Sequence, residues 1–227
     1  MASQLIDLLI NPDAFFQKRM ADKENLARPA LIVLAGAILA AASGYLTSTL
    51  TSKMLEGAGF GTGLVFAISV IGAFIGVFVY WVIATGVFYL ISLLFEGKGS
   101  FSRSLETIGY GFLPLVFGYL VTLAVALVYI PRITLPQLSQ ESLKDPQAVL
   151  NATRIFMTDP TVVQFTRITM VISILFLLWS TYCWINGMKH ARQMTLKNAT
   201  ICVGTPVFLY ILYLLAIILL SSALFQM

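Results

Sequence analysis

Five long stretches without a charged residue constrain this chain more than any other feature of its sequence. A transmembrane helix needs about 20 mostly apolar residues to cross about 30 Å of hydrocarbon. Each stretch is close to that length or longer, and none contains Asp, Glu, Lys, Arg or His. Backbone polar groups in lipid must be satisfied within the segment, so such stretches fold as helices. The predicted spans are residues 29–50, 63–95, 112–130, 168–188 and 201–225.

The overall composition agrees with a membrane protein. Hydrophobic residues make up 59% of the 227 residues and charged residues 11%, whereas a soluble domain carries about 25% charged residues. Too few polar side chains remain to cover a surface in water, which argues against a soluble enzyme, a nucleic-acid binder or a disordered adaptor. The expected fold is an all-α polytopic membrane protein, with a five-span membrane domain over residues 29–227 that follows an amphipathic segment over residues 1–28.

The second stretch is unusually long. Its 33 uncharged residues would form a helix of about 50 Å. We favour one long helix that tilts, or bends near Gly72 or Gly86. The alternative is a short interfacial piece before Gly72, followed by one span.

The positions of Lys and Arg predict the orientation. Nine of these residues fall before the first span or in the loops that follow the second and fourth spans, and five fall on the other side. Because positive residues collect on the cytoplasmic side, we expect a cytoplasmic N-terminus and a C-terminus outside. The membrane would be the plasma membrane in a prokaryote, or that of the ER or Golgi in a eukaryote.

The loop between the third and fourth spans, residues 131–167, is expected to be a small helical cap on the outer side. Asp145-Pro146 and Asp159-Pro160 each place a capping side chain before a proline at a first helical position. One helix would begin at Pro146, and a second would begin at Pro160 and continue into the fourth span. Asn151 opens an Asn-Ala-Thr glycosylation pattern in this loop.

The N-terminal segment predicts two short helices, with Asn11 capping the second. Phe15 and Phe16 beside Lys18 and Arg19 suit a helix that lies in the headgroup region on the cytoplasmic surface. An equally weighted alternative is that the two phenylalanines fill a space between the cytoplasmic ends of the spans.

A second amphipathic piece lies between the second and third spans. Arg103 and Glu106 are three residues apart on its polar face and can form an ion pair. We interpret this piece as an elbow that leads into the third span, and a partner-binding surface is the alternative. Its apolar residues at helical spacing, and those that lead into the span, are Phe101, Leu105, Ile108, Tyr110 and Pro114.

These two pieces carry a resemblance to a known family. The sequence NPDAFFQKRM, then GKGSFSRSLETIGYGFLPLVFGYL, together with five spans, resembles the Ypt-interacting-protein or Yip domain family over nearly the whole chain. The resemblance implies a five-span helical fold with a cytoplasmic N-terminus. Eukaryotic members are implicated in early secretory traffic and interact with prenylated Rab-type GTPases and with one another.

Those eukaryotic members carry a long cytosolic N-terminal region with an Asp-Leu-Tyr-Gly-Pro motif. This chain has about 28 residues there and lacks the motif, which places GTPase binding in doubt and makes it similar to the shorter prokaryotic members. The partners that we expect are the lipid bilayer and related membrane proteins or a second copy of the chain. No nucleic acid is expected.

Small residues predict close helix packing. Gly36, Ala40 and Gly44 recur every four residues in the first span, and Gly72 and Gly76 form a GxxxG in the second. Such residues let helix backbones approach closely. Packing inside one bundle is the preferred interpretation, and a homo-oligomer seam is the alternative.

The sequence offers no set of catalytic residues, metal ligands or cofactor contacts. His190 is the single histidine, and we expect it either to be solvated or to face the headgroups. The two cysteines, Cys183 and Cys202, lie near the cytoplasmic ends of adjacent spans and could approach one another in the core. Trp179, Tyr182 and Trp184 suit an interfacial aromatic belt, and Asn186 is expected to bond a neighbouring helix. These four residues come from the inner half of the fourth span.

Three functions remain open. We prefer a non-enzymatic membrane organiser or trafficking-type adaptor that acts through its cytoplasmic amphipathic surfaces. The second is a passive channel or carrier for an uncharged or lipid-like substrate, which would use polar residues such as Tyr80, Thr85 and Thr122. An enzyme that acts on lipid is the third and least favoured.

Overall fold

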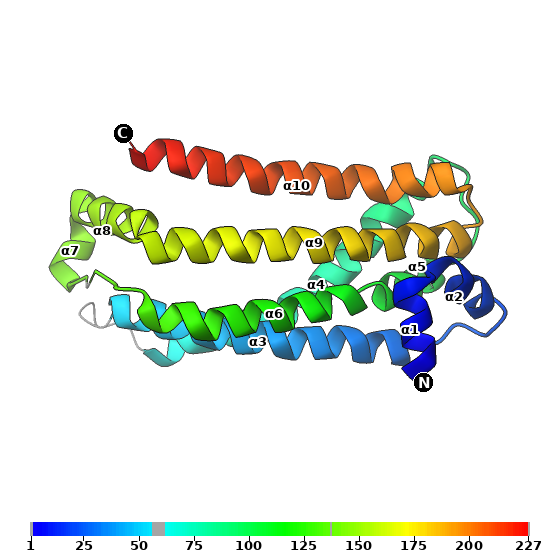
Figure 1. Ribbon diagram of the computed structural model, residues 1–227, viewed down its shortest axis with the longest axis horizontal. Coiled ribbons are helices and arrows are strands. Elements are labelled where there is room, and N and C mark those ends of the chain that lie inside the picture. Colours follow the sequence, from blue (N-terminus) through cyan, green and yellow to red (C-terminus); the bar gives the residue numbers. More distant parts are fainter. Residues whose placement is uncertain (1, 56–61, 137, 227) are drawn as a thin grey trace.

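Long helices run lengthwise through the molecule, and short helices cover its two ends (Figure 1). The computed structural model describes residues 2–55, 62–136 and 138–226, with the side chains of 2–4, 55, 62, 140 and 218–226 left aside. Within these ranges every regular element is a helix. The helices are α1 (Ala2–Ile10), α2 (Pro12–Arg19), α3 (Ala27–Leu55), α4 (Thr62–Leu93), α5 (Phe101–Tyr110), α6 (Leu113–Tyr129), η2 (Ile130–Arg132), α7 (Gln140–Lys144), α8 (Pro146–Thr158), α9 (Pro160–Ala191) and α10 (Leu196–Gln226).

Five helices in the described part of the chain are long and apolar enough to cross a membrane. They correspond to the five predicted spans, and the expected all-α, five-span fold is confirmed. The chain termini lie at opposite ends of the bundle (Figure 1), as an odd number of crossings requires. Their crossing segments are Ala27–Met54, Gly63–Leu93, Leu113–Arg132, Pro160–Ala191 and Leu196–Ile217.

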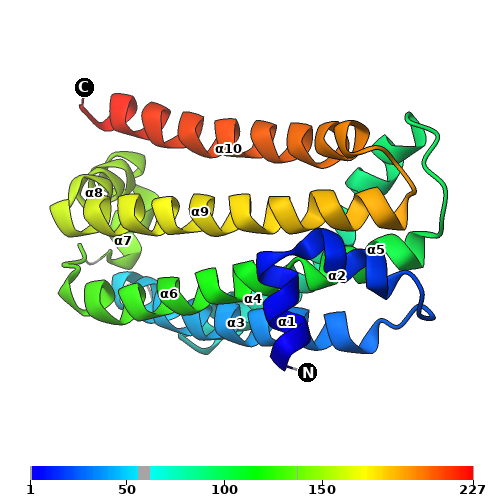
Figure 2. The same ribbon diagram turned by 45° about the vertical axis from the view of Figure 1, so that its right-hand side comes forward.

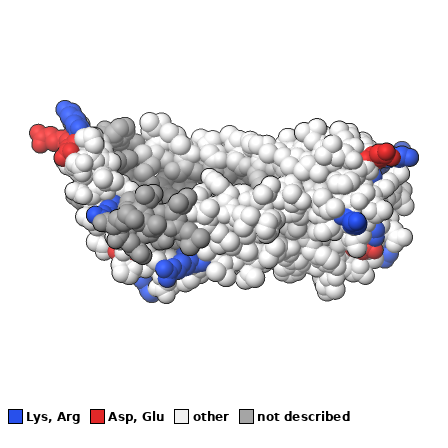
Figure 3. Space-filling model, turned by 90° about the horizontal axis from the view of Figure 1, so that it is seen from above, with Lys and Arg blue, Asp and Glu red and all other residues white. Residues whose placement is uncertain are grey.

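Charged side chains gather at the two ends of the molecule. In Figure 3 the middle of the visible face carries no Lys, Arg, Asp or Glu, while both ends do. The uncoloured band is the part of the surface that suits hydrocarbon, because lipid offers no hydrogen-bond partners. We call the end that holds α1, α2 and α5 the N-terminal end, and the end that holds α7 and α8 the C-terminal end (Figures 1 and 2).

Local capping explains where several helices begin. The Asn11 side chain accepts a hydrogen bond from the backbone N–H of Ala14, and Asp145 accepts one from Gln147. Asp159 accepts from both Thr161 and Val162. Each capped helix has proline at its first position, where the missing N–H costs nothing. The structure therefore confirms that α2, α8 and α9 begin after the capping residues predicted from the sequence, which are Asn11, Asp145 and Asp159.

The second span is one continuous helix. α4 comprises 32 residues without interruption, and it runs obliquely across the back of the bundle in both ribbon views (Figures 1 and 2). At 1.5 Å per residue it is about 48 Å long, which exceeds the thickness of the hydrocarbon, and tilting accommodates the excess. The alternative of a separate interfacial piece before Gly72 is wrong.

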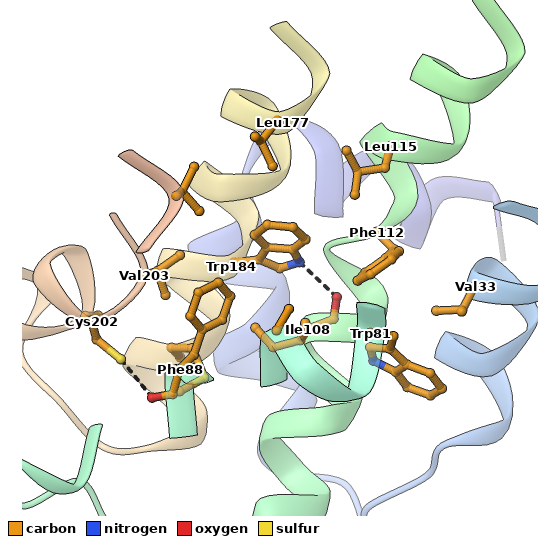
Figure 4. Close-up of a cluster of buried hydrophobic side chains, with 14 of the residues drawn as sticks. Val33, Trp81, Phe88, Ile108, Phe112, Leu115, Leu177, Trp184, Cys202 and Val203 are labelled. Atoms are coloured by element: carbon orange, nitrogen blue, oxygen red, sulfur yellow. Dashed lines mark hydrogen bonds between the residues drawn. The ribbon is translucent and has the colours of Figure 1, made fainter. Parts of the chain in front are cut away.

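Aromatic side chains fill the core where α4, α5, α6 and α9 meet (Figure 4). Trp184 on α9 is fully buried, and its ring lies 5.7 Å from those of both Phe88 and Phe112. The Trp184 indole N–H donates to the Ile108 carbonyl, and the Trp81 indole N–H donates to that of Leu105, both at 2.9 Å. Two tryptophans from different spans thereby fix α5.

This packing corrects the predicted aromatic belt on α9. Trp179 and Tyr182 are partly exposed, but Trp184 belongs to the core. Asn186 donates to the Tyr182 carbonyl of its own helix rather than to a neighbouring helix. The aromatic composition of α9 could not distinguish these positions, because which side of a span faces protein depends on its neighbours.

The small residues of α3 contact neighbouring helices, whereas the two glycines of the GxxxG on α4 do not. α3 packs along α4, and a Cβ at Gly44 would lie only 2.6 Å from the Ser69 carbonyl oxygen on α4. Gly36 faces Tyr119 on α6, and Ala40 packs against the core. Gly72 and Gly76 instead face open space, because no other helix in the described part of the chain has an atom within 4 Å of a Cβ built there. Within one chain, the predicted packing role of Gly72 and Gly76 is therefore wrong.

The cap at the C-terminal end has the two expected helices. α8 runs from Pro146 to Thr158, and α9 begins directly at Pro160. The backbone N–H of Leu138 donates to the Met54 carbonyl, which ties the cap to the end of α3. Asn151 is exposed, but it lies inside helix α8, whereas its glycosylation pattern is typical of surface loops.

Candidate functional site at the N-terminal end of the bundle

The two short N-terminal helices fold back against the bundle. α2 packs on α9, and Leu8, Phe16 and Tyr110 form a buried cluster. The Phe15 ring meets the Tyr110 ring edge-on at 5.3 Å. The Phe16 ring is fully buried beside Gly187 of α9. The structure thus places Phe16 between helix ends, while Phe15 remains half-buried.

A buried carboxylate lies at the centre of this end. Glu106 on α5 is fully buried, and it accepts a hydrogen bond from Arg103 Nη1 at 2.8 Å. Arg19 Nη2 from α2 lies 2.5 Å from its other oxygen, close enough for an ion pair. That oxygen and Arg19 Nε lack a well-formed hydrogen bond. The predicted pair of Arg103 and Glu106 exists, but its placement on a polar outer face is wrong, because α2 covers it.

Further contacts extend this group, which we call the ion-pair cluster (Arg19, Asp22, Glu24, Arg103 and Glu106). Asp22 lies 3.0 Å from Arg19 Nη1, and Arg103 also donates to the Asp22 carbonyl at 2.7 Å. Ser100 donates to Glu24 at 2.5 Å and accepts from the Arg103 backbone as the cap of α5. The Ser100 hydrogen bond lowers the pKa of Glu24, against an opposing effect of burial, and Arg103 adds to the lowering.

Asp13 ties α2 to the C-terminal turn of α9. Its carboxylate lies 2.6 Å from Lys189 Nζ and 2.7 Å from His190 Nε2. The hydrogen bonds from Lys189 and His190 hold the pKa of Asp13 below its ordinary value. Of the two alternatives for His190, a solvated side chain is wrong, because the side chain is 17% exposed and faces Asp13.

Arg192 secures the turn that precedes α5. Its side chain is almost fully buried, and its Nη2 and Nε donate to the Gly97 carbonyl at 2.5 Å and to the Ser92 hydroxyl at 2.9 Å. It also donates to the Gly99 carbonyl and lies over the Tyr89 ring, 4.3 Å from its centre. Gly99 has a φ of +110°, and a Cβ there would overlap the Ala191 carbonyl. Only glycine therefore fits this turn.

The sequence did not reveal the role of Arg192. In the sequence, Arg192 is a cation in a short loop and indicates only the orientation of the chain in the membrane. Its hydrogen-bond acceptors could not be predicted, because they lie more than 90 residues earlier in the chain. The glycines at 97 and 99 indicate a turn, but nothing in the sequence indicates what that turn contacts.

The elbow itself is more buried than its amphipathic pattern predicted. Leu105 and Ile108 pack into the core, and Phe101 meets the Tyr89 ring edge-on at 5.4 Å. Pro114 lies in the first turn of α6 and is buried. Gly109 lies where a Cβ would come within 2.7 Å of Pro29, so α5 and α3 meet with no room for a side chain.

A polar cavity of about 530 Å³ opens on this end. We call it the end cavity. Its walls come from the end of α2 and its cap (Gln17, Met20), from α5 and its cap (Ser100, Arg103), and from the end of α9 and the turn after it (Lys189–Ala191, Gln193 and Met194). Three elements that are far apart in sequence therefore share one concave surface.

The two cysteines and the histidine form no metal centre. Cys183 and Cys202 are free and fully buried, and they contact the backbone carbonyls of Leu8 and Phe88, respectively. Over residues 2–55, 62–136 and 138–226 no group of three His, Cys, Asp or Glu residues is placed to hold a metal ion.

The comparisons with known proteins agree with this architecture. The Yip1 domain matches residues 6–218, from α1 to most of α10. An uncharacterized protein of Methanocaldococcus jannaschii is 41% identical over 124 residues, which are 54% of this chain and 87% of that protein. No solved structure matches the chain at a significant level. The residues that carry the resemblance, from Asn11 to Phe16 and from Gly99 to Pro114, meet at the N-terminal end, and the chain belongs to the Yip1 domain family of membrane proteins.

Proposed function

We propose that this protein is a non-enzymatic membrane organiser that presents the N-terminal end of its bundle to partner proteins at the cytoplasmic surface. One observation carries the proposal. Charged residues link α2 to α5 through the buried Glu106 and α2 to α9 through Asp13, and these segments include the residues that resemble the family. A function placed at this surface would account for why these distant segments converge.

The rigidity of this surface supports a binding role. Ion pairs and hydrogen bonds from Arg19, Arg103 and Arg192 hold α2, α5 and the preceding turn in one arrangement. A surface that is fixed before binding loses less entropy when a partner docks. The end cavity, with Gln17 at its rim, offers the partner a concave polar patch.

The nine-to-five distribution of Lys and Arg supports a cytoplasmic location for this end. The five residues on the other side include four spread over the cap at the C-terminal end. A partner would therefore be a cytoplasmic protein or the cytoplasmic part of another membrane protein.

The packing of the candidate conduit residues favours the organiser over a channel or carrier. The Thr85 hydroxyl is fully buried and donates to the Trp81 carbonyl of its own helix. The Tyr80 ring packs against Phe112, with 5.6 Å between ring centres. Both polar residues thus take part in helix packing around the aromatic core.

Photocrosslinking in native membranes tests the proposal. A photoreactive amino acid at Gln17, exposed on the rim of the end cavity, should form discrete protein adducts. The same group at Leu209, which is 59% exposed on α10, is the matched control and should crosslink to lipid. Equal adduct patterns at the two positions would contradict the proposal. Passage of a neutral solute through liposomes that contain the purified protein would favour the conduit.

A further inference from the structure

The first helix, α1, lies crosswise to the spans. In both ribbon views it runs across the direction of α3 and α6, whereas the long helices follow the length of the bundle (Figures 1 and 2). A helix that runs crosswise to membrane spans lies in the plane of the membrane. Its contacts with the spans determine its depth in the bilayer, and its depth determines what its outer side meets.

The contacts of α1 with α9 lie inside the uncharged part of that span. The Trp179 indole N–H donates to the Leu9 carbonyl at 3.2 Å. The Cys183 thiol donates to the Leu8 carbonyl at 3.7 Å. The uncharged part of α9 ends at Met188, so at 1.5 Å per residue these two contacts lie about 14 Å and 8 Å within it. On the side of α9, α1 is therefore at a depth that suits hydrocarbon.

The contact with α3 gives a similar depth. The buried cluster that contains Leu8 packs against Ile32, which lies one helical turn beyond Arg28, the last charged residue before the apolar part of α3. By contrast, α2 contacts the charged end of α9, where Asp13 lies 2.6 Å from Lys189 Nζ. Although α1 and α2 are consecutive, α1 thus lies nearer to the middle of the bilayer.

Different sides of α1 carry different residues. Leu8 is fully buried against the bundle. Ile6 and Ile10 lie two residues to either side of it, so they share the opposite side of the helix, and they are 53% and 74% exposed. The charged residue of α1, Asp7, lines a cavity of about 520 Å³ together with Lys18 of α2. The carboxylate therefore faces the side toward α2, and the two isoleucines face away from the bundle.

The exposed side of α1 continues the apolar surface of the spans. Trp179, which bonds α1, is 37% exposed, and Tyr182 on the next turn of α9 is 49% exposed. At the start of α3, Leu31 is 65% exposed. Because hydrocarbon surrounds the uncharged part of the spans, an apolar side chain at this depth meets acyl chains.

The composition of α1 indicates how it would be held there. Helices on membrane surfaces are typically rich in Lys and Arg on their polar side, and attraction to anionic lipids adds to their binding. The sequence of α1, ASQLIDLLI, contains neither residue. Contact between apolar groups, rather than attraction between charges, is therefore the interaction that α1 offers to lipid.

We propose that α1 is an in-plane membrane helix that places Ile6 and Ile10 among the acyl chains of the leaflet at the N-terminal end. The bundle holds its inner side through Leu8 and the two carbonyl contacts, and lipid covers its outer side. The helix that contacts acyl chains is then α1, whereas the sequence pattern indicated the segment around Phe15 and Phe16.

Fluorescence quenching tests the proposal on the full chain in phosphatidylcholine liposomes. Ile10→Cys carries a bimane label, and the native cysteines, Cys183 and Cys202, are fully buried and should stay unlabelled. A nitroxide on the acyl chains should quench the label at position 10 strongly, because the two groups share the hydrocarbon. Iodide in the aqueous phase should quench it only weakly.

Gln17→Cys is the matched control, since Gln17 is exposed on α2 at the rim of the end cavity. Its label should show the reverse pattern, with strong quenching by iodide and weak quenching by the nitroxide. Equal quenching by iodide at positions 10 and 17 would place α1 in water and overturn the proposal. Weak quenching by both agents at position 10 would mean that protein, such as a second copy of the chain, covers α1, and this result would also overturn it.

The lipid composition separates apolar insertion from surface attraction. Replacing part of the phosphatidylcholine by phosphatidylglycerol should leave the nitroxide quenching at position 10 unchanged, because α1 has no cation to attract the anionic lipid. Quenching that required phosphatidylglycerol would contradict insertion through Ile6 and Ile10. The organiser function concerns the end cavity and is tested by crosslinking at Gln17, so failure of either proposal leaves the other standing.

Discussion

Glu106 is the residue on which the N-terminal end depends most. It is fully buried and faces two guanidinium groups from different elements. Removing one member of a buried ion pair leaves the other charges uncompensated, at a cost of about 3–5 kcal/mol. We therefore expect Glu106→Gln to lower the melting temperature markedly and to loosen α2.

An exposed carboxylate provides the control for that substitution. Glu141→Gln on α7 makes the same chemical change where no burial is involved, and its effect should be small. A double-mutant cycle with Arg103→Gln should give a coupling energy of about 0.5–3 kcal/mol. Additive effects of Glu106→Gln and Arg103→Gln would count against a shared cluster.

Asp13 makes the stability of the N-terminal end depend on pH in the acid range. Its pKa is lowered in the folded chain by hydrogen bonds from Lys189 and His190. A lowered pKa contributes stability that is present above the unfolded value, near pH 4, and is lost as the pH falls through the folded value. Asp13→Asn should therefore melt below the wild type at pH 7, and the difference should shrink below about pH 4. A difference that stayed constant down to pH 3 would rule out this role of Asp13.

At the residue scale, sequence identified which side chains are unusual but often not what they contact. Phe16 and Glu106 were singled out from local patterns, and both are central to the N-terminal end. His190 and Trp184 were assigned to the surface, yet one faces Asp13 and the other fills the core. Their partners lie between 70 and 180 residues away in sequence, and a helical period carries no information about such contacts.

At the scale of elements, the buried ring of Phe16 is one of the contacts that hold α1 and α2 to the bundle. Truncating a buried phenylalanine to alanine costs about 3–5 kcal/mol. We expect Phe16→Ala to release these helices while the five spans stay inserted. Cleavage by trypsin after Lys18 and Arg19 should become faster. Ile10→Ala, at an exposed position of α1, should leave the cleavage rate unchanged, and equal rates in both variants would argue against docking through Phe16.

The contact of α3 with α4 requires a small residue at position 44. A side chain at Gly44 would collide with the Ser69 carbonyl, and overpacking costs about 1–3 kcal/mol. Gly44→Leu should therefore lower the melting temperature, whereas the double substitution of Gly72 and Gly76 by Leu should not. A smaller species on detergent sizing for that double variant would indicate an oligomer seam on the open face of α4. A melting temperature for Gly44→Leu equal to that of the wild type would contradict the close approach.

At the scale of the whole molecule, the bilayer makes the fold predictable. Each span must be a helix of sufficient length, so the five apolar stretches determine the number of crossings. Capping is equally local, which is why the starts at Pro12, Pro146 and Pro160 could be predicted. The sequence does not indicate which sides of the helices meet. Every side of α4 is apolar, so its sequence could not indicate that Gly72 faces open space and Trp81 the core.

The orientation of the whole molecule is the remaining prediction. The alternation of five crossings puts Lys98, after α4, and Lys144, on α7, at opposite ends of the bundle, and both residues are exposed. The distribution of Lys and Arg predicts that Lys98 faces the cytoplasm. Cysteine at position 144 should react with an impermeant thiol reagent in intact cells, and cysteine at position 98 only after permeabilisation. The unsubstituted chain is the control, because Cys183 and Cys202 are fully buried. The reverse pattern would place the ion-pair cluster outside the cytoplasm, and reaction of both positions from one side would mean that α6 does not cross the membrane.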